Sequence, residues 1–570
     1  MDSTDNIKIV FLIMRRMRQP LLTLIVVYAV AVLGLTLIQG DTPQGESWSM
    51  SIFHAFYFVS YMATTIGFGE IPYEFNDAQR LWVTLCMYAA VVAWIYALGT
   101  ILSLLQDKTF QRTLAERSFA RRIQRMREPF YLVCGYGETG SALVRALTDR
   151  SQHAAVIDHD EQKTNDLQLQ NLRDYVPALH ADARVPKHLQ EAGLSKHSRC
   201  DGVVAVTDDN DTNLKIAITS KLLHPEIKVI CRADSRDVEA NMDSFGTDYI
   251  IDPFDTFSRH LAMAFQAPCL CLLQRWLSGV EFSQLEEPTY PPHQGRWIVC
   301  GYGRFGKAMV ECLRNEGIEV VVIETSPEIT GEPPPGYVIG RGTEEGPLRE
   351  AGLEGAVGVV AGTNDDTDNL SIVMTARDIN PGIFTILRQN QSENQPLIDA
   401  INSDMVMHPS SIIADKIRLL LGTPMLHQFI SLSLHQDDAW GCELISRISG
   451  LVGNLIPDVQ QITLNRIEAS ALPRDESTHI SLGDLLRDPW KRERQLPCIV
   501  LLVQRRQETV LLPDADFELK EDDKILLCGD NHAFDRLHWN LNHASSLEYV
   551  RTGEVKAQGW LWKKIQKMRK

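Results

Sequence analysis

Two charge-free apolar stretches near the start of the chain restrict its fold more than any other feature. Residues 21–38 and 81–105 contain 18 and 25 residues without a charge. As helices rising about 1.5 Å per residue, both can cross a hydrocarbon core about 30 Å thick. Arginines precede the first stretch and several basic residues follow the second. We therefore expect a multi-pass protein of the cell membrane, with both termini in the cytoplasm.

The connection between these stretches has two parts. Residues 49–62 are apolar and aromatic, and they predict a re-entrant helix. The irregular backbone after such a helix is tolerated at membrane depth only where it lines a wet cavity. A turn with one aromatic residue between two glycines follows, and its residues are Thr65, Ile66, Gly67, Phe68 and Gly69. Glycine adopts backbone angles that can aim consecutive carbonyls into one pore, where they replace the water around a K⁺ ion.

This turn resembles the selectivity filter of potassium channels, whose usual sequence is Thr-Val-Gly-Tyr-Gly-Asp. Phe68 lacks the tyrosine hydroxyl of that pattern, so a hydrogen bond that often braces the filter from behind is in question. One chain supplies one filter loop and a pore needs four, so we expect a homotetramer in the lipid bilayer. The inner span has one glycine, Gly99, which we interpret as the gating hinge; close helix packing at Gly99 is the alternative.

Past residue 128 the chain alternates strands and helices, and one motif occurs twice. Each copy has a buried strand, a Gly-x-Gly-x-x-Gly turn, a helix, and a second strand that ends in an acid. The residues are Gly135, Gly137, Gly140 and Asp158 in the first copy, and Gly301, Gly303, Gly306 and Glu324 in the second. The pattern predicts a Rossmann-like fold whose acid accepts hydrogen bonds from a ribose.

Further motifs recur in register, which indicates a duplicated domain. Residues 189–194 match 348–353, and 207–214 match 363–370, with an offset that drifts only from 166 to 156 residues. These motifs resemble the RCK family (regulator of potassium conductance, also called KTN or TrkA-N) over about residues 130–530. Residues 513–517 and 522–529 look like that family's β-rich C-terminal subdomain, also called TrkA-C. The resemblance implies that eight such domains form a ring under a tetrameric pore and that ligands reshape the ring.

We predict an α-helical two-span pore domain followed by α/β structure, namely two tandem Rossmann-like parallel-sheet domains and a C-terminal β-rich subdomain. The expected boundaries are 1–106 for the pore, 107–128 for a linker, 129–280 for the first RCK domain, 281–295 for a second linker, 296–430 for the second RCK domain, 431–545 for the C-terminal subdomain and 546–570 for a basic tail.

The acids at the strand ends favour a free ribose, so NAD, NADH or ADP is the expected regulatory ligand. The two turns differ, because Glu138 in the first would repel phosphate whereas Arg304 in the second could bind it. The alternative is that the glycines serve packing alone. Ca²⁺ gates some relatives, but Arg232 and Arg388 occupy the matching positions and disfavour a calcium cage. The aspartates of residues 208–211 and 365–368 offer weak divalent-ion binding or, alternatively, cap helices.

The composition narrows the choice of function. A formal charge of −17 argues against nucleic-acid binding. The 11 cysteines show no CxxC pair, so we expect reduced thiols and no disulfide framework. We expect a ligand-gated potassium channel and not an enzyme. The alternatives are a membrane-anchored NAD-dependent dehydrogenase, for which no His/Asp catalytic pair is evident, and a regulatory subunit of a potassium transporter, which would lack a filter.

Overall fold

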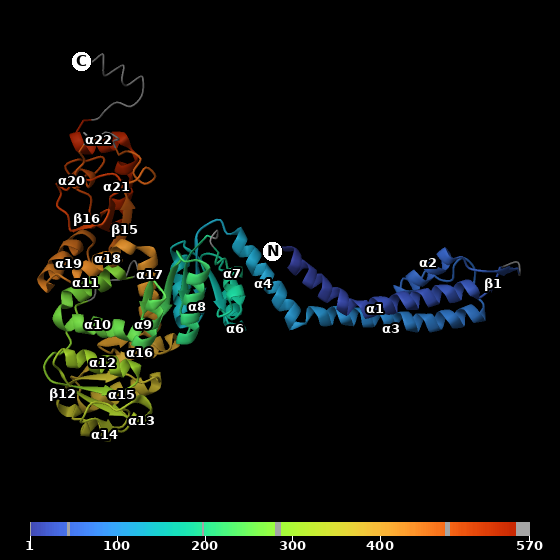
Figure 1. The fold of residues 1–570 in the computed structure, drawn as a ribbon, viewed down its shortest axis with the longest axis horizontal. Coiled ribbons are helices and arrows are strands. Elements are labelled where there is room, and N and C mark those ends of the chain that lie inside the picture. Colours follow the sequence, from blue (N-terminus) through green and yellow to red (C-terminus); the bar gives the residue numbers. More distant parts are fainter. Residues whose placement is uncertain are drawn as a thin grey trace, which may run out of the picture. The chain divides into compact units, whose positions relative to one another are not determined.

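We describe a computed structural model of the chain. It describes residues 2–42, 46–195, 199–279, 285, 287–472 and 479–554, with side chains from residue 14 onward. The chain divides into two compact units, residues 1–122 and 123–570, and we treat each by itself (Figure 1). Part of the expected linker at 281–295 and residues 555–570 of the expected basic tail lie outside the described residues.

The first unit is built on helices. Its elements are α1 (Asp2–Leu37), β1 (Gly40–Asp41), β2 (Ser47–Trp48), α2 (Ile52–Ala63), α3 (Asp77–Leu105) and α4 (Lys108–Arg125), the last of which runs into the second unit. Met14–Leu37 and Asp77–Leu105 are long and apolar enough to cross a membrane, and they contain residues 21–37 of the first predicted span and all of the second. Helix α2 covers most of the predicted re-entrant segment and is capped by Ser51, whose side chain accepts a hydrogen bond from the backbone of His54.

Helices α1 and α3 pack closely because α1 has a glycine at the contact. A Cβ added to Gly34 would lie 2.1 Å from the ring of Trp82, so a side chain there would displace that ring. The Trp82 indole also donates a hydrogen bond to the Ala31 carbonyl at 3.3 Å. Buried Ala55 and Val59 place α2 in the same apolar core. The pairing of α1 with α3 therefore holds α2, and the turn after it, in one position.

The second unit contains two parallel six-stranded sheets with the same strand order. The first sheet runs β5-β4-β3-β6-β7-β8 and the second β11-β10-β9-β12-β13-β14, the doubly wound order of a Rossmann fold. The first consists of β3 (Phe130–Cys134), β4 (His153–Asp158), β5 (Ala178–His180), β6 (Cys200–Ala205), β7 (Lys228–Arg232) and β8 (Tyr249–Ile251). The second consists of β9 (Arg296–Cys300), β10 (Glu319–Glu324), β11 (Val338–Ile339), β12 (Ala356–Ala361), β13 (Phe384–Arg388) and β14 (Met405–Met407).

Helices connect the strands of each sheet. In the first copy these are α5 (Glu138–Asp149), α6 (Glu161–Leu169), α7 (Pro186–Glu191), α8 (Asn210–Leu223) and α9 (Arg236–Ser244). In the second they are α12 (Arg304–Asn315), α13 (Pro327–Thr330), α14 (Glu345–Glu350), α15 (Asp366–Ile379) and α16 (Gln395–Ile401), with short 3-10 turns at Leu353–Gly355 and Ser392–Asn394. The predicted duplication is therefore present element by element.

The two copies exchange helices. After β8 the chain continues into α10 (Pro253–Gln266) and α11 (Pro268–Ser278), and after β14 into α17 (Pro409–Gly422) and α18 (Pro424–Ser433). Helix α10 packs on α12 of the second copy, beside which Figure 1 draws it, and supplies Phe254, Phe257 and Leu261 to that copy's core. Helix α17 packs on α5 and supplies Ile413 and Ile417 to the core of the first copy. Each copy is thus completed by a helix of the other.

The chain ends in an antiparallel sheet with helices on it. Its elements are α19 (Asp438–Val452), β15 (Asp458–Thr463), α20 (Leu482–Leu485), β16 (Cys498–Arg505), β17 (Glu508–Leu511), β18 (Lys524–Gly529), α21 (Asn531–Asn542) and α22 (Ala544–Thr552), with strand order β15-β18-β16-β17. One face packs against α20, α21 and α22, and the other against α11, α18 and α19. The sheet therefore packs against the helices that end the two copies, α11 after the first and α18 after the second.

Candidate functional site

The filter-like turn follows α2 and turns away from it through alternating left-handed residues. Thr65, Gly67 and Gly69 have φ angles of 63°, 64° and 94°. A Cβ at either glycine would meet nothing within 4 Å, so the backbone conformation, and not crowding within the chain, is what requires glycine there. The Tyr61 carbonyl accepts hydrogen bonds from the backbone N–H of Ile66 at 2.9 Å and of Gly67 at 3.4 Å.

The hydroxyl that Phe68 lacks is supplied from α2. The Tyr61 hydroxyl donates a hydrogen bond to the Gly69 carbonyl at 2.6 Å. The Phe68 ring packs edge-on against Tyr61, with centroids 5.4 Å apart, and is stacked 6.5 Å from Tyr57. The turn is therefore braced by a tyrosine of the preceding helix. Sequence analysis placed Tyr61 on this helix but did not assign it this role, because the residue lies outside the filter motif.

The chain after the turn is held by Glu70. Its carboxylate accepts hydrogen bonds from the backbone of Phe75 at 2.8 Å and from Arg80 at 3.0 and 3.1 Å. Arg80 lies in the first turn of α3, so the outer end of this helix is tied to the residue directly after Gly69. These contacts fix both ends of the turn within one chain.

Helix α3 is continuous through Gly99. A Cβ at this glycine would meet nothing within 4 Å, so among the described residues of a single chain no neighbour requires glycine there. Close packing within the chain is therefore not the reason for Gly99. The hinge role stays a prediction.

In the first copy, Asp158 lies directly beneath the glycine turn. Its side chain accepts hydrogen bonds from the backbone of Tyr136 at 2.5 Å and of Asp160 at 2.8 Å, and the residue is 3% exposed. Gly135 has a φ of 101°, and a Cβ at Gly140 would lie 2.0 Å from the Gly135 carbonyl oxygen. The first and third glycines thus serve the turn itself, whether or not a ligand binds.

The second copy repeats this geometry. Glu324 accepts hydrogen bonds from the backbone of Tyr302 at 2.5 Å and of Ser326 at 2.9 Å, and it is 6% exposed. A Cβ at Gly306 would lie 1.9 Å from the Gly301 carbonyl oxygen. At Gly303 it would meet nothing within 4 Å, so the middle glycine leaves open space over the N-terminus of α12. Each carboxylate has lone pairs left for further hydrogen bonds.

Arg304 begins α12 and faces the first copy. Its guanidinium forms an ion pair with Asp234, whose side chain is 2% exposed and also accepts from Arg232 at 2.9 Å. The guanidinium lies 5.5 Å from the ring centroid of Phe254, on the exchanged helix α10. The predicted phosphate partner is therefore held at the contact between the two copies, with its side chain about half exposed.

Arg388 has fewer ion-pair partners among the described residues than Arg232, its counterpart in the first copy. Arg232 pairs with Asp208 and Asp234, whereas Asn364 and Asn390 stand at the equivalent positions around Arg388. Arg388 is 8% exposed and donates to Asn364 at 2.8 Å, while its Nε has no hydrogen-bond partner among the described residues.

The guanidinium of Arg388 also lies against Phe254, at 5.2 Å from the ring centroid. Burial, and then the positive charge of Arg304, lower the pKa of Arg388 to about 10, so it is still cationic at neutral pH. The carboxylates of Asp366 and Asp234 oppose both effects, so these acids partly balance the charge of Arg388. Sequence analysis used Arg388 only to argue against calcium; the signal that was available was the pair of asparagines at the positions of Asp208 and Asp234.

The equivalent contact on the first copy's turn has the opposite charge. Glu138 begins α5 and accepts a hydrogen bond from the Ser392 hydroxyl of the second copy, which lies 3.3 Å from the His408 ring. Burial lowers the pKa of His408, so its ring is largely neutral at pH 7. The first residue of the helix after each glycine turn thus contacts the other copy. That residue is the carboxylate Glu138 in the first copy and the guanidinium Arg304 in the second.

The aspartate-rich loops cap helices. Asp209 accepts from the backbone of Thr212 at 3.1 Å, and Asp365 from Thr367 and Asp368 at 2.8 and 3.1 Å. Among the described residues, one group of at least three metal-ligating side chains comes together, and it consists of Cys269, Asp438 and Cys442. The loops therefore take the capping alternative in this structure.

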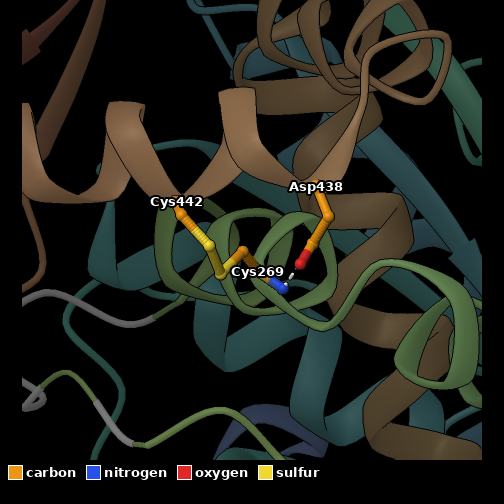
Figure 2. A group of neighbouring side chains, drawn as sticks. All are labelled: Cys269, Asp438 and Cys442. Atoms are coloured by element: carbon orange, nitrogen blue, oxygen red, sulfur yellow. Dashed lines mark hydrogen bonds between the residues drawn. A yellow bond between two sulfur atoms is a disulfide. The ribbon is translucent and has the colours of Figure 1, made fainter.

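One cysteine expectation is wrong. The sequence predicted reduced thiols and no disulfide, but the structure joins Cys269 of α11 to Cys442 of α19 (Figure 2). The two residues are 173 positions apart, and the chain has no CxxC spacing that would point to the pair. The other nine cysteines are free.

Comparison with known families agrees with this architecture. Residues 21–107 match the ion channel family, and residues 131–253 and 297–409 each match the TrkA-N domain. The chain joins an ion-channel domain to two TrkA-N domains. The TrkA-N matches begin at the strand before each glycine turn and end where α10 and α17 begin.

Relatives share parts of the chain. Potassium channel protein 1 of Methanocaldococcus jannaschii is 25% identical over 37% of this chain and 60% of its own length. The voltage-gated potassium channel Kch of Escherichia coli is 23% identical over 38% of this chain and 50% of its own. The chain thus spans less than two thirds of the length of these relatives. A solved GsuK channel bound to NAD covers 93% of this chain and 99% of its own at 15% identity, with a TM-score of 0.44.

Proposed function

We propose that the chain is a subunit of a potassium-selective channel. The observation that carries this proposal is the braced turn between two membrane-length helices. Thr65, Gly67 and Gly69 are left-handed and alternate along the turn, which directs its consecutive carbonyls, and the Tyr61 hydroxyl holds the Gly69 carbonyl that directly follows them. The ion-channel match over residues 21–107 supports the same conclusion. In this proposal the carbonyls of Thr65, Ile66, Gly67 and Phe68, with the Thr65 hydroxyl, hold dehydrated K⁺.

Selectivity tests this proposal directly. Purified protein in liposomes should conduct K⁺ well and Na⁺ poorly, as measured by reversal potentials. Tyr61→Phe removes the hydroxyl bond to Gly69 but keeps the ring, and it should reduce the K⁺/Na⁺ permeability ratio. Tyr57→Phe is the matched control, because Tyr57 contacts Phe68 through its ring. Equal K⁺ and Na⁺ permeabilities in the unmodified protein would refute the proposal.

The working assembly in this proposal is a homotetramer. One chain provides a single filter turn, whose Ile66 and Phe68 are each 60% exposed in the isolated chain, as expected of residues that meet other subunits. Four turns are needed to surround an ion. Native mass measurement in mild detergent should give four chains, and a stable dimer or monomer would contradict the assembly.

We further propose that an adenine nucleotide such as NAD or ADP binds the second TrkA-N domain, on the cytoplasmic side, and gates the pore. The support is chemical. Glu324 lies under the glycine turn with free lone pairs for ribose hydroxyls, and Gly303 leaves room for phosphate at the start of α12. Arg304 provides positive charge at the start of α12, and Arg388, whose Nε has no hydrogen-bond partner among the described residues, lies against the same Phe254 ring. In the first copy Glu138 would repel the same phosphate.

Gating follows if the nucleotide competes for Arg304. A phosphate bound at this guanidinium would weaken its ion pair with Asp234 of the first copy, so binding would change the contact between the copies. A ligand shifts gating only by its difference in affinity between two states, commonly about 1–3 kcal/mol per coupled site.

Calorimetry on the full-length protein tests nucleotide binding. We expect one NAD or ADP per chain, with weaker binding in Glu324→Gln but not in Asp158→Asn. The two substitutions alter the same type of bond to a turn, so a difference between them reports the ligand and not the fold. If no nucleotide binds and none alters open probability, the glycine turns are structural.

A further inference from the structure

The bonded cysteines lie at the contact between two segments distant in sequence. Cys269 is the second residue of α11 and is buried, whereas Cys442 lies on α19 and is exposed. Their Cα atoms are 5.2 Å apart. Figure 2 shows Cys442 and Asp438 pointing from α19 toward the first turn of α11, where the sulfur of Cys269 meets that of Cys442. Cys442 is therefore the more accessible of the two residues to a small molecule in solvent, whereas Cys269 is 9% exposed.

Contacts other than the sulfur bond hold the two helices together here. Asp438, four residues before Cys442 and on the same side of α19, accepts hydrogen bonds from the backbone of Cys269 at 2.8 Å and of Leu270 at 3.2 Å. A Cβ at Gly441 would lie 2.9 Å from the Leu270 side chain and 3.1 Å from its backbone nitrogen. Because these contacts do not depend on the bond, the two thiols should stay adjacent when it is reduced.

The pair also differs from every other cysteine. Of the nine free cysteines, eight are buried, and Cys271 is partly buried, which raises the pKa of its thiol. The second TrkA-N copy has Met425 at the position equivalent to Cys269, at the start of α18. Among the described residues, the contact of α11 with α19 is therefore where an exposed cysteine is bonded to a second cysteine.

We propose that Cys269 and Cys442 form a reversible thiol–disulfide exchange site whose oxidant is a low-molecular-weight disulfide such as oxidised glutathione. The proposal rests on the cytoplasmic placement given under the proposed function, because disulfides in that compartment are usually transient or redox-sensing. The structure shows the oxidised form, and the adjacent thiols are the reduced form.

The exchange occurs in two balanced steps. The Cys442 thiolate attacks one sulfur of the small disulfide, forms a mixed disulfide, and releases the other half as a thiolate. The Cys269 thiolate then attacks the Sγ of Cys442 and releases the second half. Two protein thiols are oxidised and one small disulfide is reduced to two thiols; a small dithiol reverses both steps.

Closing the site adds a cross-link between α11, which follows the first TrkA-N copy, and α19, which leads into the C-terminal subdomain. Helix α11 follows α10, whose apolar side completes the second copy, and α19 leads into β15 of the C-terminal sheet. Both helices pack in the core that includes Trp276 and Phe429. The bond therefore restricts movement of α11, which packs on that sheet together with α18, relative to α19.

Mass spectrometry of the full-length protein tests the site. The protein is reduced with dithiothreitol, freed of it, and exposed to oxidised glutathione before digestion without reductant. We expect wild type to give a peptide containing Cys269 linked to one containing Cys442. Cys269→Ser should retain glutathione on Cys442, because the second step is blocked. Cys271→Ser is the matched control and should close the bond as wild type does.

Three results would overturn the proposal. In the first, wild type gives no linked peptides. In the second, Cys442 of the Cys269→Ser variant stays free of glutathione. In the third, the reduced protein retains one Zn²⁺ per chain, held by Cys269, Asp438 and Cys442, and resists oxidation; Zn²⁺ added alone is the probe. The readouts need neither nucleotide nor conduction. A failed exchange site and a failed channel proposal are therefore distinguishable.

Discussion

The two TrkA-N domains have the same strand order, the same glycine turn and an acid at the same place beneath it, yet the residue that begins the next helix is Glu138 in one and Arg304 in the other. Around them, Arg232 pairs with Asp208 and Asp234, whereas Asn364 and Asn390 stand at the equivalent positions around Arg388 and the nearby acid of that copy is Asp366. The comparison teaches that the fold depends on the glycines and on the bonds of the acid, which are common to both copies. The ligand preference depends on charges that differ between them.

The largest expected effect tests what the copies share. Gly140→Val and Gly306→Val would each place a Cβ about 2 Å from a backbone carbonyl oxygen, which no side-chain movement can relieve. We expect each to destabilise its own domain by more than about 4 kcal/mol. Limited proteolysis and thermal unfolding should show comparable losses. If one variant were tolerated, the two turns would not be structurally equivalent.

The next prediction concerns a position at which the two exchanged helices, α10 and α17, carry different residues. His260 on α10 and Lys416 on α17 occupy equivalent positions, 156 residues apart. Burial, followed by the charge of Lys416, lowers the pKa of His260 from 6.5 to about 4. Between pH 6.5 and 4 the unfolded chain therefore binds a proton that the folded chain does not.

The folded protein therefore has its full stability above pH 6.5. As the pH falls from 6.5 toward 4, protonation of His260 in the unfolded chain lowers the free energy of unfolding by at most about 3 kcal/mol. Denaturant unfolding at several pH values measures this loss. His260→Gln is the control and should show a weaker dependence on pH across that window. The same slope in both proteins would show that His260 is not the group responsible.

A binding prediction tests how the copies differ. Glu324→Gln should weaken nucleotide binding about 10- to 100-fold, that is, by about 1.4–2.7 kcal/mol, because an amide cannot accept hydrogen bonds from a ribose with both atoms. Asp158→Asn should leave the measured affinity unchanged. Calorimetry with NAD and with ADP provides the measurement. The reverse pattern would move the operative site to the first copy.

The smallest effect is expected where the copies meet at the first turn. Ser392→Ala removes the hydrogen bond to Glu138, and both side chains are exposed, so the loss of stability should be within about 0.5 kcal/mol. Nucleotide affinity should not change. A loss as large as that of Glu324→Gln in the binding assay would show that the first turn takes part in ligand binding.

Much of this architecture was predictable because it depends on local pattern. The spans follow from charge-free length, and the sheets follow from the glycine turn with an acid 18 residues after its third glycine. The exchange of α10 and α17 was not predictable. Each helix has an apolar side, and only packing decides which copy that side covers. The bond between Cys269 and Cys442 depends in turn on where α19 packs.

The candidate sites divide in the same way. Gly67, Gly69, Asp158 and Glu324 stand out because a motif fixes their spacing. Tyr61 reaches the filter turn only because α2 ends where it does, and Arg388 is notable only because two neighbours are asparagines. Residues that act by compensating, or failing to compensate, a neighbour carry no motif of their own, so they appear once the neighbours are known.

The exchange of helices also constrains how this chain can evolve. If the two copies were produced as separate chains, the first would lack Ile413 and Ile417 in its core, and the second would lack Phe254 and Leu261. Both products would expose apolar surface that their own sequence cannot cover. The two domains of this chain therefore depend on each other for a complete core, whereas Glu138 and Arg304 lie outside that core and differ in charge.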